Sequence, residues 1–154
     1  MPRLVQKVVS GGQSGVDRAA LDVALALGIP CGGWCPRGRR TEDAPLPDRY
    51  PLNETPSADY SQRTEWNVRD SDGTLVLAPG TPDGGSALTL ELAMRLGRPS
   101  LAVDPRDLER VEEVREWLAR YRVGSLNVAG PRESRAPGAY DAARRFLGAL
   151  LEKD

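Results

Sequence analysis

The stretch from Leu4 to Leu27 decides the fold class, and at its centre stands Ser10-Gly11-Gly12-Gln13-Ser14-Gly15. The residues before this centre, Leu4 to Val9, are rich in valine and predict a short buried strand. The residues after it, Val16 to Leu27, repeat alanine and leucine at helical spacing, and Gly28 is a natural helix stop. A strand, a glycine-rich loop and a helix in this order form the first half of a β-α-β unit.

The same alternation of strands and helices continues along the chain. We expect further strands at 73–77, 100–103 and 126–129, and further helices at 60–70, 87–96, 106–121 and 140–151. Such alternation predicts a mostly parallel sheet covered by helices on both faces. No repeat or linker interrupts the pattern, so residues 1–154 are expected to form a single Rossmann-like, three-layer α/β/α domain.

The glycine-rich loop after the first strand is a candidate anion site. Backbone N–H groups at the start of a helix point outward, and the helix dipole places partial positive charge there. The glycines would let the backbone approach a phosphate, and two polar side chains could donate hydrogen bonds to it. The alternative is a tight turn without a ligand, because the pattern is neither G-x-G-x-x-G nor a Walker A motif. The candidate ligand-binding residues here are Gly11, Gly12, Gln13, Ser14 and Gly15, together with Arg18, which could instead pair with Asp22.

A second glycine-rich turn, Gly84-Gly85-Ser86, follows the strand at 73–77 and precedes the next helix. Like the first loop, it places backbone N–H groups and the positive end of a helix dipole at one point. Open α/β sheets bind ligands at the carboxyl ends of their strands. If the two strands are neighbours, two helix N-termini converge on one crevice. Thr89 joins the candidate binding residues, and Glu91 could touch a ribose or substrate or could simply be a solvated helix carboxylate.

The segment from Ile29 to Pro56 is a long excursion rich in glycine and proline, with one short strand expected around Ile29 to Trp34. Its basic residues Arg37, Arg39 and Arg40 could fold over a bound anion, and we take Arg37 and Arg39 as candidate ligands. The alternative is a solvated charge run neutralised by nearby acidic residues.

Asp72 is a candidate for a magnesium ion that accompanies phosphates, with Asp70 two residues before it. The alternative is a turn or capping role for one or both carboxylates. Cys31 and Cys35 form a poor zinc site because the chain contains no histidine, and we predict no metal-binding residues beyond the magnesium alternative. The lack of histidine also excludes Ser-His-Asp and Cys-His hydrolases.

The composition limits the classes of partner. The formal net charge is −1, so the overall field attracts the chain neither to nucleic acid nor to an anionic membrane. A secretory signal and a long apolar run are both missing from the sequence, which favours a cytoplasmic protein. We therefore expect a small-molecule ligand, no nucleic acid and no membrane.

Several blocks of the sequence together resemble the molybdenum cofactor carrier family, also described as circularly permuted YpsA-like members of the SLOG superfamily, related to the DprA and Lonely Guy proteins. The blocks are 11–22, 32–39, 63–68, 70–75, 84–89 and 127–134, in which Ser14 and Ser86 stand where threonine is common. The resemblance implies a Rossmann-like fold, a homo-oligomer (dimer or tetramer), and binding of the molybdenum cofactor (molybdopterin) or a nucleotide.

The resemblance also bears on catalysis. Lonely Guy enzymes carry a P-G-G-x-G-T-x-x-E motif, and here Leu88 replaces the middle glycine while Thr89 and Glu91 remain. We therefore expect a non-catalytic carrier or storage protein for the cofactor. The alternatives are a nucleotide-binding sensor and a nucleoside-monophosphate phosphoribohydrolase in which Glu91 would be the catalytic carboxylate.

Overall fold

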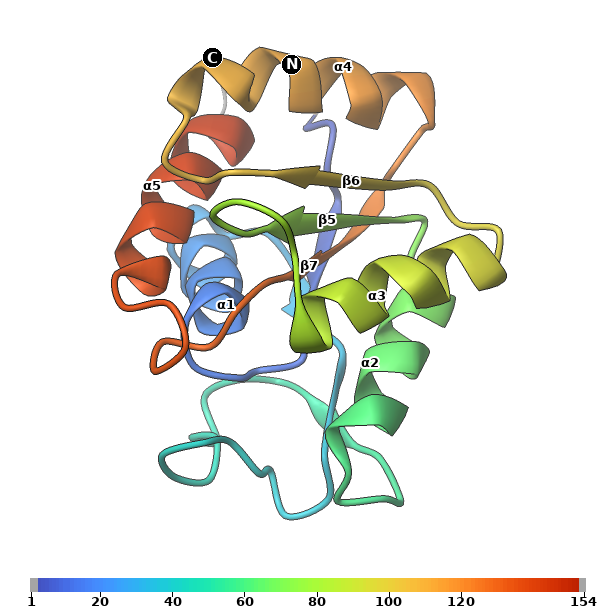
Figure 1. Ribbon diagram of the computed structural model, residues 1–154, viewed down its shortest axis with the longest axis vertical. Helices are drawn as coiled ribbons and strands as arrows, with labels where there is room; N and C mark the ends of the chain where they lie inside the picture. Colours follow the sequence, from blue (N-terminus) through green and yellow to red (C-terminus); the bar gives the residue numbers. More distant parts are fainter. Residues whose placement is uncertain (1–2, 153–154) are drawn as a thin grey trace.

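A central parallel sheet with helices on both faces forms the fold, and the computed structural model describes residues 3–152 (Figure 1). The predicted α/β class and its parallel sheet are confirmed. The strands are β1 (Lys7–Val9), β2 (Cys31–Gly32), β3 (Trp34–Cys35), β4 (Asn53–Glu54), β5 (Gly73–Leu77), β6 (Ser100–Val103) and β7 (Ser125–Ala129). The helices are α1 (Val16–Leu27), α2 (Tyr60–Arg69), α3 (Gly84–Arg95), α4 (Val111–Arg120), preceded by the 3₁₀ turn η1 (Leu108–Arg110), and α5 (Ala139–Leu151).

The strand order in the main sheet is β2-β1-β7-β5-β6, and every neighbouring pair is parallel. The chain leaves β1 towards β2 at one edge and leaves β5 towards β6 at the other edge. Strand β7 therefore lies between the two halves, with Val9 opposite Asn127 on one side and Thr74 opposite Asn127 on the other. The carboxyl ends of β1, β7 and β5 surround a topological switch point, which is where open α/β sheets bind ligands.

Helices α1, α4 and α5 cover one face of the sheet, and α2 and α3 cover the other (Figure 1). The larger core lies under the first group, where fully buried Phe146 and Leu147 of α5 meet Leu75 and Leu126 of the sheet. A smaller cluster of Val68, Leu92 and Ala93 joins α2 to α3. Burial on both faces explains why the strands read as continuous apolar runs in the sequence.

The excursion from Ile29 to Pro56 contains more structure than the single strand expected. Gly33, with φ of 130°, separates β2 from β3, so that β3 leaves the main sheet and pairs with β4 in a two-stranded parallel sheet. A satellite core of Leu21, Cys35, Leu46, Tyr50 and Leu52 lies beneath the excursion. The long loop is therefore ordered on its own small core.

Helix α3 begins at Gly84 and not at Ala87 as the sequence suggested. The backbone N–H groups of Ser86 and Ala87 both donate to the carbonyl of Asp83, at 3.0 and 3.2 Å, which closes the first turn there. The second glycine-rich segment is therefore the first turn of the helix rather than a loop before it.

Among residues 3–152, no helix is both long enough and apolar enough to span a lipid bilayer.

Candidate functional site

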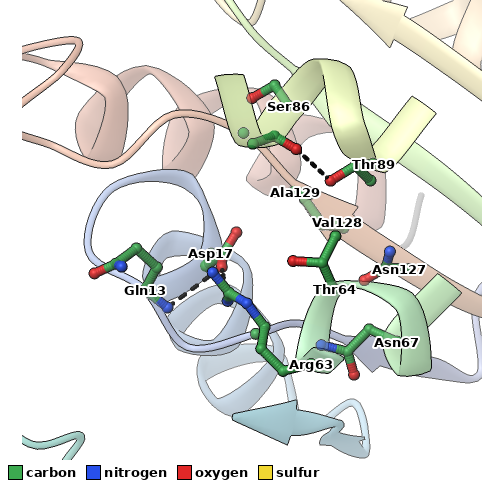
Figure 2. Close-up of a pocket in the computed structure, with 13 residues that line it drawn as sticks. Gln13, Asp17, Arg63, Thr64, Asn67, Ser86, Thr89, Asn127, Val128 and Ala129 are labelled. Carbon is green, nitrogen blue, oxygen red and sulfur yellow. Dashed lines mark hydrogen bonds and ion pairs between the residues drawn. The ribbon is translucent and has the colours of Figure 1, made fainter. Parts of the chain in front are cut away.

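Two adjoining cavities open at the switch point of the sheet. The inner cavity has a volume of about 60 Å³ and reaches β7, while the outer cavity has a volume of about 280 Å³ and reaches the loop after β7. The residues that line both cavities are Gln13, Arg63, Thr64, Gly85, Ser86 and Gly130. Figure 2 shows the inner cavity, with α3 above it, α2 below it and the start of α1 to one side.

The glycine loop after β1 uses most of its backbone donors internally. The N–H of Gly12 donates to Ser10 Oγ at 3.3 Å, that of Gln13 to Asp17 Oδ2 at 3.3 Å, and that of Ser14 to Gln13 Oε1 at 3.1 Å. The carboxylate of Asp17 thus occupies a place that a bound anion would take. Of the three candidate glycines, only Gly11 lines a cavity, and a Cβ there would lie 1.8 Å from Arg63 Nη1.

The other candidates in this loop hold neighbouring segments together. Gln13 Oε1 accepts from the backbone N–H of Glu42 at 2.8 Å, and Ser14 Oγ hydrogen bonds to the Glu42 carboxylate and accepts from the N–H of Glu133 at 3.1 Å. Gly15 has φ of 78°, and a Cβ there would lie 2.5 Å from the carbonyl oxygen of Pro131. Gln13 lines both cavities, whereas Ser14 and Gly15 line neither of them.

A buried ion pair forms one wall of the inner cavity. Arg63 Nη1 donates to Asp17 Oδ2 at 3.0 Å, and the two side chains are only 11% and 7% exposed. Figure 2 shows the two side chains meeting across the gap between α1 and α2. Burial raises the pKa of Asp17, while the guanidinium of Arg63 and the N–H of Gln13 act in the opposite direction and favour the carboxylate.

The N-terminus of α3 presents free donors to the cavities, unlike the loop after β1. Within residues 3–152, the N–H groups of Gly84 and Gly85 have no acceptor, and the Ser86 hydroxyl has no partner although this residue is only 7% exposed. Thr89 Oγ1 donates to the carbonyl of Gly85 at 2.8 Å, so this hydroxyl supports the first turn of the helix. Gly85, Ser86 and Thr89 line the inner cavity, and Gly84 lies behind them, against Arg135.

The arginines predicted as ligands line neither of the two cavities. Arg37 is exposed on the excursion, and Arg39 donates to four backbone carbonyls of the excursion itself. Arg18 donates to the carbonyl of Gly12 through Nε and Nη2, both at 3.2 Å, and its guanidinium lies over the ring of Tyr50. The arginines that do line the outer cavity are Arg63, Arg132 and Arg135.

The acidic candidates also lie away from the cavities. Asp72 stands at the amino end of β5, where its Oδ2 accepts from the N–H groups of Gly124 and Ser125 at 3.1 and 2.8 Å. Glu91 is exposed and pairs with Arg95 at 2.6 Å. Asp70 accepts from Trp34 Nε1 at 2.9 Å, so the two carboxylates proposed for magnesium have separate partners. In the described part of the chain, no three cysteine or acidic side chains gather as a metal site would require.

Several cavity residues were not chosen from the sequence. Asp17, Arg63, Asn127, Arg132 and Arg135 come from α1, α2, β7 and the loop after β7, which only the folded chain brings together. One signal was available, because 63–68 and 127–134 are two of the blocks that carried the family resemblance. Asp17 carried no such further signal, because its burial, and with it the need for a partner, shows only in the folded chain.

Comparison with known proteins identifies the family. The model of the circularly permutated YpsA SLOG family matches residues 8–151. The chain belongs to this family. A crystal structure named Putative molybdenum carrier protein, from Syntrophus aciditrophicus SB, is 42% identical and superimposes with a TM-score of 0.95, covering 97% of each chain. No curated protein matched. In this member of the SLOG family, four of the six blocks that suggested the resemblance contribute walls to the two cavities.

Proposed function

We propose that this SLOG-family protein binds a phosphate-bearing small molecule in the two cavities, and that this molecule is the molybdenum cofactor. The observation that carries the proposal is the start of α3, where Gly85, with its free N–H group, and Ser86, with its unpaired hydroxyl, line a cavity that three arginines also line. The name of the crystal structure that resembles this chain supports the choice of cofactor.

The phosphate would lie at the first turn of α3. The helix dipole and the free N–H groups of Gly84 and Gly85 favour an anion there. Arg132 and Arg135 line the same cavity, and guanidinium groups bind phosphate oxygens in pairs. Asp83 is the one carboxylate on the wall of the outer cavity, and Arg135 partly neutralises it at 3.6 Å.

The residues present fit the cofactor in kind and in size. The two cavities share lining residues, and their combined volume lies at the lower end of the range for small-molecule sites. Ser86, Gly85 and Arg135 would hold the phosphate, and the inner cavity would receive the polar edge of the pterin. When bound, the cofactor supplies a metal-binding dithiolene, and this chain's residues would orient the molecule and shield it from water.

The position of Glu91 argues against the phosphoribohydrolase alternative. Its carboxylate lies outside both cavities and pairs with Arg95, so it cannot approach a glycosidic bond in a ligand held there without leaving that partner. A sensor that binds a nucleotide at the same place would use the same phosphate contacts. The identity of the bound molecule therefore distinguishes a cofactor carrier from a nucleotide sensor.

The test is native mass spectrometry of freshly purified protein, followed by fluorescence of the oxidised extract. Stoichiometric pterin would support the cofactor, whereas a nucleotide mass would point to the sensor reading. Arg135→Glu is expected to lower phosphate-ligand affinity by roughly 10-fold or more, because it replaces an attractive charge by a repulsive one. Arg145→Glu is the matched control, since Arg145 is an exposed arginine of α5 outside both cavities. Equal loss in both variants would contradict the proposed phosphate position.

The assembly and location of the protein are also proposals. A homo-oligomer, dimer or tetramer, is implied by the family resemblance, and light scattering coupled to size exclusion measures it directly. A cytoplasmic location agrees with the two cysteines, which are unpaired with one another. Burial raises the pKa of Cys31 and of Cys35, which keeps both thiols protonated near neutral pH.

A further inference from the structure

Two side-chain oxygens of residues that line the inner cavity have no hydrogen-bond partner in residues 3–152, and both keep solvent-accessible surface. Asp17 receives its two hydrogen bonds at Oδ2, which leaves Oδ1 free. Asn127 is 3% exposed, and its Nδ2 donates to Thr74 Oγ1 at 3.2 Å, which leaves its Oδ1 free. Both residues line the cavity, and Figure 2 shows them on opposite sides of it. A ligand that fills this cavity would therefore have to donate a hydrogen bond to each oxygen, because an acceptor that loses water without gaining a donor is costly.

Three of the other polar side chains on the cavity wall are already engaged. Thr64 Oγ1 donates to the carbonyl of Tyr60, and Thr89 Oγ1 to that of Gly85. Both ends of the Asn67 amide bind the backbone of Trp34. The cationic donor on the wall is the guanidinium of Arg63, whose Nη2 has no acceptor within residues 3–152. The inner cavity therefore offers two acceptors beside one cationic donor.

We infer that the inner cavity recognises the 2-amino-4-oxopyrimidine edge shared by pterins and guanine. This edge carries an amino group and a ring N–H, which would donate to Asp17 and Asn127, and a carbonyl oxygen, which would accept from Arg63. The inference rests on the proposed phosphate site, because the phosphate would be held at α3 while the ring extends from the outer cavity inward. A volume of about 60 Å³ admits the edge of a ring and leaves its body in the outer cavity.

The same arrangement rejects other heterocycles. Adenine presents a ring nitrogen acceptor where guanine presents a ring N–H, so it would face the Asp17 carboxylate with a lone pair. Hypoxanthine keeps the ring N–H and the carbonyl but lacks the 2-amino group, so one acceptor would remain unpaired. Sites built to hydrogen bond a group discriminate strongly against ligands that lack it.

Three nucleotides with the same ribose phosphate test this on the unmodified protein. Isothermal titration calorimetry with guanosine, inosine and adenosine 5′-monophosphate should give the tightest binding for the first. The loss of one charge-assisted hydrogen bond corresponds to an increase in Kd of roughly 10- to 100-fold. Equal Kd values for the three nucleotides would overturn the inference while leaving the phosphate site intact. The same conclusion would follow if inorganic phosphate bound but none of the three nucleotides did. Failure of phosphate and all nucleotides to bind would overturn the proposed function as well.

Variants test which residues make the protein prefer the guanosine nucleotide to the inosine nucleotide. Asp17→Asn should bring the ratio of guanosine to inosine affinities towards one, and Asn127→Ser provides a second variant if the first fails to fold. Asp22→Asn is the matched control, because this carboxylate also lies on α1 but accepts from Tyr50 and Tyr140 outside both cavities. A ratio that stays unchanged in folded Asp17→Asn would refute the assignment. Titration with 6-hydroxymethylpterin phosphate alongside guanosine monophosphate then shows whether the site prefers a pterin or a guanine ring.

Discussion

Some arginines in this chain bind carbonyls of the protein's own backbone, whereas others line the outer cavity. Arg39 belongs to the first group. Its guanidinium donates to the carbonyls of Leu46 (2.9 Å), Pro47 (2.8 Å), Tyr50 (2.7 Å) and Leu52 (3.1 Å). Its backbone adopts φ of 55°, which a non-glycine residue rarely does. Arg39 therefore holds the turn of the excursion together from inside, and its donors are not available to a ligand.

Arg39→Ala is expected to lower the free energy of unfolding by about 2 to 3 kcal/mol, because several carbonyls lose a charged donor at once. Urea denaturation measures the change. Arg39→Lys should recover part of the loss, since an ammonium group reaches fewer of the four carbonyls. Phosphate-ligand affinity should stay unchanged in both variants, and a large drop in affinity at full stability would show that Arg39 contacts the ligand.

Arg39 binds the backbone of the excursion, whereas Arg135 lines the outer cavity, and this difference shows what the sequence could predict about single residues. A cluster of arginines on a glycine-rich loop indicates local positive charge, and the sequence of 37–40 supports no more than that. The acceptors of Arg39 are backbone carbonyls, and their directions depend on the conformation of residues 46–52. Arg135 stands near an ordinary turn in the sequence, and only the packing of that turn against α3 brings it to the cavity.

At the scale of elements, Glu42 connects the excursion to the loop after β7. Its carboxylate hydrogen bonds to the hydroxyls of Ser14 and Ser134 and accepts from the N–H of Ser134 at 3.3 Å. Burial would raise the pKa of Glu42, but the hydrogen bonds from Ser134 and Ser14 outweigh it and hold the pKa below its usual value of 4.5. The connection therefore depends on the charged carboxylate.

The sign of the pH dependence follows from this lowered pKa. The folded state binds the proton less tightly than the unfolded state, so the stabilisation is present above the ordinary value of 4.5 and is lost as the pH falls through the folded pKa. Glu42→Gln should therefore lower the urea midpoint near neutral pH, and the gap to the unmodified protein should shrink in acid. A gap that keeps the same size from neutral pH to about pH 3 would show that Glu42 does not act through its charge.

The elements themselves were predictable where the apolar pattern was strong, as in the helical spacing of α1 and the continuous buried run of β5, whose bounds match the sequence reading. The start of α3 was misplaced because Gly84 and Gly85 have low helix propensity, and the capping carbonyl of Asp83 overrides it. Strands β3 and β4 have two residues each, too few to show any period, and they exist because Gly33 redirects the chain.

At the scale of the molecule, β7 joins the two halves of the sheet and carries the floor of the inner cavity. The chain turns away immediately after this strand at Gly130, where space is very limited. A Cβ there would lie 2.3 Å from the carbonyl oxygen of Leu77 and 2.6 Å from Val16 Cγ2. Gly130 therefore allows close approach among β5, β7 and α1, and the sheet order that requires this approach could not be predicted from the sequence alone.

Gly130→Ala is expected to destabilise the protein by about 1 to 3 kcal/mol through overpacking at this junction. Gly148→Ala is the matched control, since a Cβ at this position in α5 meets no atom within 4 Å. Removing that helix glycine should instead raise stability by about 0.5 to 1 kcal/mol. Thermal denaturation of the two variants should move in opposite directions, and a shared direction would contradict the packing described at Gly130.

The central position of β7 also has a consequence for biosynthesis. Strands β1, β2, β5 and β6 are all translated before β7, yet β1 and β5 have no hydrogen-bonded contact with each other in the sheet order. A nascent chain can therefore form two separate strand pairs, but it cannot unite them until the ribosome has delivered Ser125–Ala129. The inner cavity is thus completed late in translation, and a prematurely terminated product lacking this segment has no floor for the ligand proposed above.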